Sequence, residues 1–271
     1  MTKLDNPVPY GGEQLVADQS FLRRLPVALI AKERLRFDAI VTASDISQQS
    51  FNSLRKIALE IKDDISELGN EGRAFALSQC WTLVDQLHAI RQLLIPPAKL
   101  AAKPGPFTKA LLDSTKVASL LRNKMDHLSE NLQNLSAQKG PRSPLYGSLS
   151  YFYSETYPLT GGSIVTIMSG ALHGEDTLPC VNPLERSITL PVGQFTLTAF
   201  QLSIEFGHCL GTLREWLKVN EEKIEIDIRD QLRSQVANED EIEKAMATLG
   251  GGLAVVAKIE FIADDETTGS R

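Results

Sequence analysis

The amino-acid sequence predicts an α+β fold: an N-terminal helical bundle, then a small antiparallel strand-containing segment and a further helix. Up to about residue 140, apolar residues recur at three- and four-residue steps between short breakers, which is typical of amphipathic helices. After residue 144, the apolar residues fall in short runs rich in β-branched and aromatic side chains and bounded by Gly and Pro. A group of helices followed by a group of strands indicates an α+β protein.

Three helical regions are expected in the bundle, at about 37–68, 71–95 and 107–137, joined by short connections. The start of the first region stays open, because the segment 35–41 (LRFDAIV) is also compatible with a short strand. The breakers that delimit the regions are Gly69-Asn70, Pro96-Pro97, 103–106 and 139–141.

Residues 145–200 are expected to form a small antiparallel sheet or a pair of hairpins, and a helical pattern returns over 203–220. The segment 223–228 (KIEIDI) fits a strand or a continuation of that helix, and 250–262 is a further strand candidate. We therefore divide the chain into a loose lead-in (1–20), a helical bundle (21–140), a strand and helix segment packed on the bundle (141–262) and a frayed tail (263–271).

Composition limits the classes of function. No apolar run is long enough to span a membrane, and the first residues lack the apolar core of a signal peptide. Cys80, Cys180 and Cys209 are widely spaced and form no CxxC pair, so we expect free thiols in the cytoplasm and no metal site. No phosphate-loop or dinucleotide fingerprint is present, and no cofactor is expected. The net charge of −6 argues against strong non-specific nucleic-acid binding, although 21–36 is locally basic.

One polar constellation carries the functional hypothesis. On a helix that places Leu121 on the apolar stripe, Arg122, Asn123, Asp126 and His127 point away from the stripe. This set suits metal-independent cleavage of an RNA phosphodiester. The histidine serves as acid or base near neutral pH, and the guanidinium offsets charge on the phosphate. The other interpretation is a solvated helix face with an Arg122–Asp126 ion pair.

The run Arg122-Asn123-Lys124-Met125-Asp126-His127 resembles the Arg-x4–6-His motif of the HEPN superfamily, whose domains are bundles of four to five helices. The stretches CWTLVDQLHAIRQLL and LLRNKMDHLSENL are similar to those of uncharacterised bacterial HEPN-like proteins. The resemblance covers less than half of the chain. It implies a metal-independent endoribonuclease or RNA-binding protein, usually a homodimer, often of a toxin–antitoxin or phage-defence system.

Under the resemblance, Arg122 is the phosphate clamp, His127 the acid/base and Asn123 an orienting group. Asp85 and His88, on the preceding helix, are expected as supporting residues beside this patch, together with Asp126. A hydrogen-bonded, half-buried His88 is the favoured simpler interpretation. The alternative function is a non-catalytic, dimerising helical module that binds a protein partner.

Overall fold

The computed structural model describes residues 10–25, 30–95, 104–137, 144–155, 161–170, 192–235 and 238–248. The short 3-10 helices are η1 (Phe21–Arg23) and η2 (Ile65–Glu67). The α-helices are α1 (Ala31–Ile61), α2 (Asn70–Leu94), α3 (Pro106–Ser114), α4 (Lys116–Asp126), α5 (Leu128–Ala137), α6 (Phe206–Gln235) and α7 (Glu239–Thr248). The strands are β1 (Ser148–Tyr153), β2 (Ser163–Met168), β3 (Val192–Ala199) and β4 (Leu202–Glu205).

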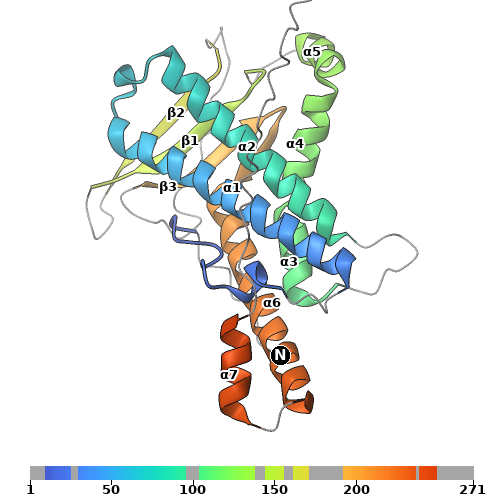
Figure 1. Cartoon of the computed structure of the whole chain (residues 1–271). Helices are drawn as coiled ribbons and strands as arrows, with labels where there is room; N and C mark the ends of the chain where they lie inside the picture. The colour runs from blue at the N-terminus through green and yellow to red at the C-terminus, as the bar shows by residue number, and fades with distance from the viewer. Residues whose placement is uncertain are drawn as a thin grey trace, which may run out of the picture.

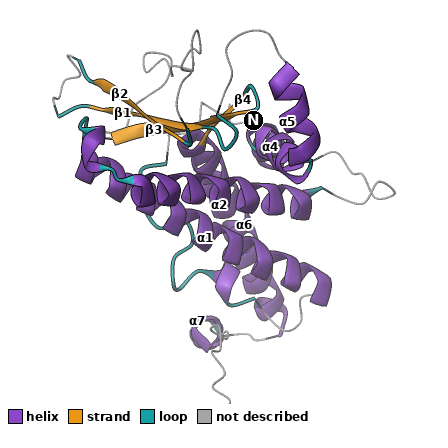
Figure 2. Ribbon diagram, turned by 90° about the horizontal axis from the view of Figure 1, so that it is seen from above, coloured by secondary structure: helices purple, strands orange, loops and turns teal. Residues whose placement is uncertain are grey.

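The expected α+β class is confirmed, with helices first and then strands and a long helix (Figure 1). The long helices α1 and α2 run antiparallel to each other and cover one face of the sheet (Figures 1 and 2). Helix α4 packs beside α2, and α6 leaves β4 to pack against α3 and β3. Helix α7 and the second half of α6 form a hairpin that projects away from the sheet (Figure 1).

The sheet has four strands in the order β2-β1-β3-β4, and every neighbouring pair is antiparallel. Leu149 of β1 lies opposite Ile167 of β2 and opposite Leu197 of β3, and all three side chains are buried. The pairing of β1 with β3 shifts between Ser150 and Phe152, as in a β-bulge.

Helices and sheet share one hydrophobic core among the described residues. A chain of rings shows this continuity, because each ring comes from a different segment. The Tyr10 and Phe51 centroids are 5.1 Å apart, those of Phe51 and Phe195 are 5.3 Å apart, and those of Phe195 and Tyr151 are 5.6 Å apart. Lead-in, α1, β3 and β1 are thus joined by edge-to-face and stacked contacts.

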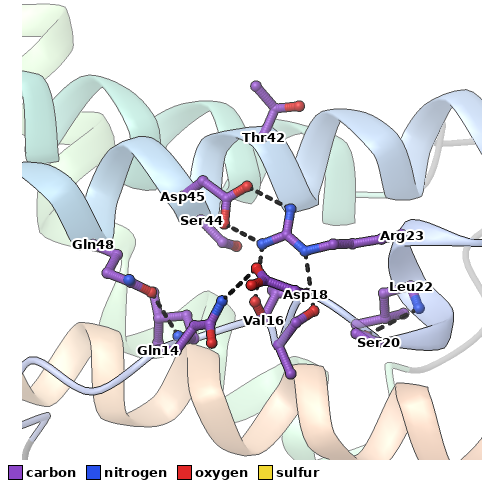
Figure 3. A network of polar contacts seen from close by, with 12 residues as sticks. Gln14, Val16, Asp18, Ser20, Leu22, Arg23, Thr42, Ser44, Asp45 and Gln48 are labelled. Atoms are coloured by element: carbon purple, nitrogen blue, oxygen red, sulfur yellow. Dashed lines mark hydrogen bonds and ion pairs between the residues drawn. The ribbon is translucent and has the colours of Figure 1, made fainter. Parts of the chain in front are cut away.

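Residues 10–20, the described part of the lead-in, differ from the loose segment expected. Tyr10, Leu15 and Val16 are buried in the core. Arg23 fixes this segment, because its guanidinium makes a bidentate pair with Asp45 of α1 and donates to the carbonyl oxygens of Val16 and Ala17 (Figure 3). An aperiodic segment gives no apolar spacing from which such packing could be predicted.

Helix α1 extends through 35–41, so the strand alternative for that segment is wrong. Asn70, expected to stop the first helix, instead opens α2. The helix expected from residue 203 begins at Phe206, because 202–205 pair with β3 as β4. The segment 223–228 continues α6, so its strand alternative is wrong as well. The strand candidate 250–262 and the tail 263–271 lie outside the described residues.

The helical region expected at 107–137 is three helices rather than one continuous helix. Thr115 separates α3 from α4, and its hydroxyl donates to the carbonyl oxygen of Leu111 at 2.7 Å. His127 ends α4 with φ −104° and ψ 39°. The Asn131 amide donates to the carbonyl oxygens of Lys124 and His127, which satisfies the end of α4 from within α5.

Among the described helices, none combines the length and apolar character needed to cross a membrane. A second, smaller apolar cluster lies in the α6–α7 hairpin, where Ile228, Ile242 and Met246 are buried. The hairpin therefore has a separate apolar cluster, whereas the first half of α6 belongs to the main core.

Candidate functional site

A pocket of about 1050 Å³ lies along one face of α2; we call it the α2 groove. Its floor is formed by residues at regular steps on α2, which include Arg73, Leu77, Trp81 and Asp85. Four-residue steps keep side chains on one helix face, so the groove follows the helix axis. Pockets that hold small ligands usually measure roughly 300–1,000 Å³, and the α2 groove is at or above the upper end.

The walls of the α2 groove come from two other parts of the chain. Arg122 and Met125 of α4 form one wall, and Tyr146 with Met168, at the end of β2, contributes to the other. Gly147 makes the second wall possible. It has φ +83°, and a Cβ there would lie 2.6 Å from the carbonyl oxygen of Thr198. Only glycine fits this close turn into β1, which carries Tyr146 to the groove.

Trp81 is a half-buried aromatic side chain with a fixed orientation at the groove. Its indole N–H donates to the carbonyl oxygen of Tyr146 at 3.0 Å, and its ring meets Phe200 edge-on at 6.5 Å between centroids. These contacts hold one edge of the indole against the sheet while the side chain lines the groove. An indole held in this way is a ready surface for a flat ligand.

Arg122 reaches the α2 groove between two carboxylates. Its Nε lies 3.1 Å from Oδ1 of Asp85, and its Nη1 lies 2.6 Å from Oδ1 of Asp126. The Arg122–Asp126 pair is the i,i+4 contact of the solvated-face interpretation, and the expected position of Asp85 beside Arg122 is confirmed. The Arg122 side chain is 37% exposed, so solvent and ligands can still contact it.

Asp85 has an unusual protonation equilibrium for a surface carboxyl group. Partial burial raises its pKa, and the neighbouring Asp126 adds to the rise, whereas Arg122 and His88 lower it. The net direction is upward, so desolvation outweighs the attraction of Arg122. A carboxyl group with a raised pKa beside a cation in a pocket is a candidate acid or base.

His88 does not line the α2 groove. Its Nδ1 lies 2.9 Å from the Ser119 hydroxyl, and the side chain is half-buried between α2 and α4. This is the hydrogen-bonded, half-buried histidine of the simpler interpretation, although the partner is a hydroxyl rather than a carboxylate or carbonyl. His88 is therefore a neighbour of the Asp85–Arg122 pair and not a groove residue.

His127 and Asn123 also lie outside the groove lining. The His127 side chain is 57% exposed, with Nδ1 at 3.8 Å from Oε2 of Glu130, and its backbone N–H donates to the carbonyl oxygen of Asn123. Because α4 ends at His127, the projection on one continuous helix does not hold beyond Asp126. The structure therefore brings Arg122 together with Asp85 and Asp126, and leaves His127 and Asn123 outside this pocket.

Sequence reasoning did not identify Arg73 or Trp81 as site residues. The available signal was the spacing of positions 73, 77, 81 and 85 on α2, with a tryptophan and two charged residues on one face. The aromatic residues Tyr151, Phe152 and Tyr153 of β1 are buried, whereas Tyr146 is exposed at the groove. Cys80 is fully buried, and burial raises the pKa of its thiol.

Protein-family models, curated proteins and solved structures gave no match to this chain. Within the described ranges, no three His, Cys, Asp or Glu side chains are grouped to hold a metal ion. The features that bear on function are therefore the α2 groove and the motif at 122–127.

Proposed function

We propose that this protein binds RNA through the α2 groove, as a HEPN-type protein of the cytoplasm. The observation that carries the proposal is that Arg122 and Trp81 line the same pocket. A guanidinium binds phosphate through two parallel hydrogen bonds, and an aromatic ring stacks on a nucleobase. RNA offers both groups in every nucleotide.

The carboxylates beside Arg122 set the strength of this contact. Asp85 and Asp126 pair with Nε and Nη1 of Arg122, so a phosphate that binds the guanidinium through two parallel hydrogen bonds competes with one of them. Partial burial disfavours the charged form of Asp85 and raises its pKa, which weakens its hold on Arg122. Modest affinity at neutral pH follows, and neutralising either carboxylate should strengthen binding.

The finer proposal is metal-independent cleavage of the bound RNA, with Arg122 on the phosphate, His127 as acid/base and Asn123 as an orienting group. The support is the resemblance at 122–127 and the exposure of His127 and Asn123 to solvent. The motif in such proteins works across a homodimer. Leu120 and Leu132, which are large apolar side chains exposed on α4 and α5, support a contact between copies near His127.

The test uses purified full-length protein and a labelled single-stranded RNA in the presence of a chelator. We expect binding in a shift assay, weaker binding in Arg122→Ala, and tighter binding in Asp126→Asn. Unchanged affinity in Arg122→Ala would reject the proposal. The variant Lys56→Ala is the matched control, because Lys56 is an exposed cation on α1 that pairs only weakly with Glu60 at 3.9 Å.

Cleavage is measured in the same samples by following the RNA length over time. We expect His127→Ala to keep binding and to lose cleavage by roughly 10²-fold or more, the size typical of a lost acid–base group. Binding without cleavage in the wild type would reject the ribonuclease and retain the RNA-binding protein. The non-catalytic, protein-binding module becomes the better hypothesis if neither is seen and the chain is a stable dimer.

A further inference from the structure

The α2 groove has a defined order of chemical groups along its length. Arg73, Trp81 and Asp85 follow one another on the same face of α2, and Arg122 is paired with Asp85. At 1.5 Å of rise per residue, Arg73 lies about 12 Å along the helix from Trp81 and about 18 Å from Asp85. The indole therefore stands between two guanidinium groups.

Resting on the proposed RNA binding, we infer that the α2 groove holds a short single-stranded stretch of RNA that runs along α2. One base stacks on Trp81, and phosphates of the same strand to either side of this base contact Arg73 and Arg122. A volume of about 1050 Å³ accommodates more than one nucleotide. Proteins that bind single strands combine cationic side chains, which contact the phosphates, with aromatic rings on which the bases stack.

The geometry excludes a double helix from the stacking position. A base can lie on the Trp81 ring only when it has left its own stack, because bases inside a duplex are covered on both faces. Leu77 and Met125, which also line the groove, give the base apolar surroundings. Unpaired RNA satisfies this requirement without the energy of base flipping.

The two cations are not equivalent. Among the described residues, the exposed Arg73 side chain has no ion-pair partner, whereas Arg122 is shared with Asp85 and Asp126. A phosphate at Arg73 displaces only water and counterions, while a bidentate phosphate at Arg122 also competes with a carboxylate. Arg73 should therefore contribute more to the salt dependence of binding than Arg122.

The first measurement uses the emission of Trp81 itself. The chain has two tryptophans, and Trp216 is buried with its indole N–H on the Thr108 hydroxyl. In a Trp216→Phe variant, Trp81 is the sole tryptophan. We expect single-stranded RNA to quench its emission with the same dissociation constant as in the shift assay, and duplex RNA of the same sequence to leave it unchanged. Equal quenching by the duplex would overturn the inference.

The second measurement is the slope of log affinity against log salt concentration. Each phosphate contact on a single strand contributes about 0.7 to this slope. Arg73→Ala should lower it by about 0.7 and Arg122→Ala by less. Arg233→Ala removes the same charge on the α6–α7 hairpin, where Arg233 pairs with Glu239, and should leave it unchanged. Trp81→Leu should weaken binding roughly tenfold at an unchanged slope.

The outcomes separate the inference from the proposed function. RNA binding that depends on Arg122 but is insensitive to Trp81→Leu and Arg73→Ala would overturn the single-strand path and retain the RNA-binding protein. No RNA binding by the wild type at low salt would overturn both. The affinity of Trp81→Leu is compared with that of the wild type only if the two proteins have the same circular dichroism spectrum. The emission test keeps Trp81 and does not depend on the folding of that variant.

Discussion

Asp85 lines the α2 groove and is a carboxyl group with a raised pKa. It forms an ion pair with Arg122 at 3.1 Å, yet its pKa is raised, because burial and Asp126 disfavour its charge more than Arg122 favours it. The pKa of Asp85 is higher in the folded state than its ordinary value of 3.8. At a pH above the folded-state pKa, its charge therefore lowers the free energy of unfolding. The stability recovers as the pH falls through the folded-state pKa towards 3.8, because the folded protein then binds the proton more readily.

We predict that Asp85→Asn leaves the free energy of unfolding at pH 7 equal to or above that of the wild type. The amide removes the unfavourable charge and keeps the shape, and the difference should vanish as the pH falls through the raised pKa of Asp85. Urea denaturation at several pH values measures this. A clear loss of stability at pH 7 would mean that the Arg122–Asp85 pair is net stabilising.

The same substitution should tighten RNA binding, because Arg122 then has one carboxylate partner instead of two. Asp113→Asn serves as the control of equal charge change, since Asp113 pairs with Lys109 on the exposed face of α3 and does not line the α2 groove. Equal effects of the two substitutions on affinity would show that only net charge matters.

At the scale of elements, the break between α4 and α5 falls at His127, the last residue of the motif at 122–127. Asn131 is buried and donates to the carbonyl oxygens of Lys124 and His127, so it stabilises the turn between the two helices. Asn131→Ala should lower the free energy of unfolding by about 1–2 kcal/mol, since two carbonyl groups lose a buried donor. Thermal denaturation, with the exposed Ser129→Ala as control, measures this loss; equal melting temperatures would contradict it.

The lead-in offers a second test of an element. The Arg23 side chain is 24% exposed, and its guanidinium donates hydrogen bonds to Asp45 and to two backbone carbonyl oxygens (Figure 3). Arg23→Ala should cost about 2 kcal/mol, because partly buried hydrogen bonds to a charged group are lost. Arg23→Lys keeps the charge but not the fork geometry, so it should recover only part of that stability in urea denaturation. Full recovery by lysine would show that charge alone fixes the segment.

Periodicity predicted the elements better than it predicted the site. The spacing of apolar residues located α2 to within one residue at each end and indicated the antiparallel sheet. It missed the breaks at Thr115 and His127, because these depend on side chains that hydrogen-bond to the backbone and not on apolar spacing. It found Asp85, Arg122 and Asp126 together, but not Trp81 and Arg73, since only tertiary packing shows which face of α2 stays uncovered.

At the scale of the whole molecule, the shared core links the bundle to the sheet. Phe51 of α1 lies between Tyr10 of the lead-in and Phe195 of β3, so the helical part and the strand part share one core. We therefore expect one cooperative unfolding transition, with helix content by circular dichroism and Trp81 emission changing together. Two separate midpoints would show that the bundle and the sheet are independent units.

Phe195→Ala should confirm that coupling. It removes a fully buried ring that contacts both Phe51 and Tyr151 and should cost about 3–5 kcal/mol. Both the circular dichroism and the Trp81 emission midpoints should shift to lower denaturant together. A shift confined to one of them would contradict a common core.

The most direct test of the central claim is where RNA touches the chain. A single-stranded RNA that carries a photoreactive uridine is cross-linked to the protein, and the modified peptides are identified by mass spectrometry. RNA bound in the α2 groove predicts adducts within Asn70–Leu94, at Trp81 above all, that disappear in Arg122→Ala at matched salt. Adducts confined to the α6–α7 hairpin or to the lead-in, with none on α2 or α4, would contradict it.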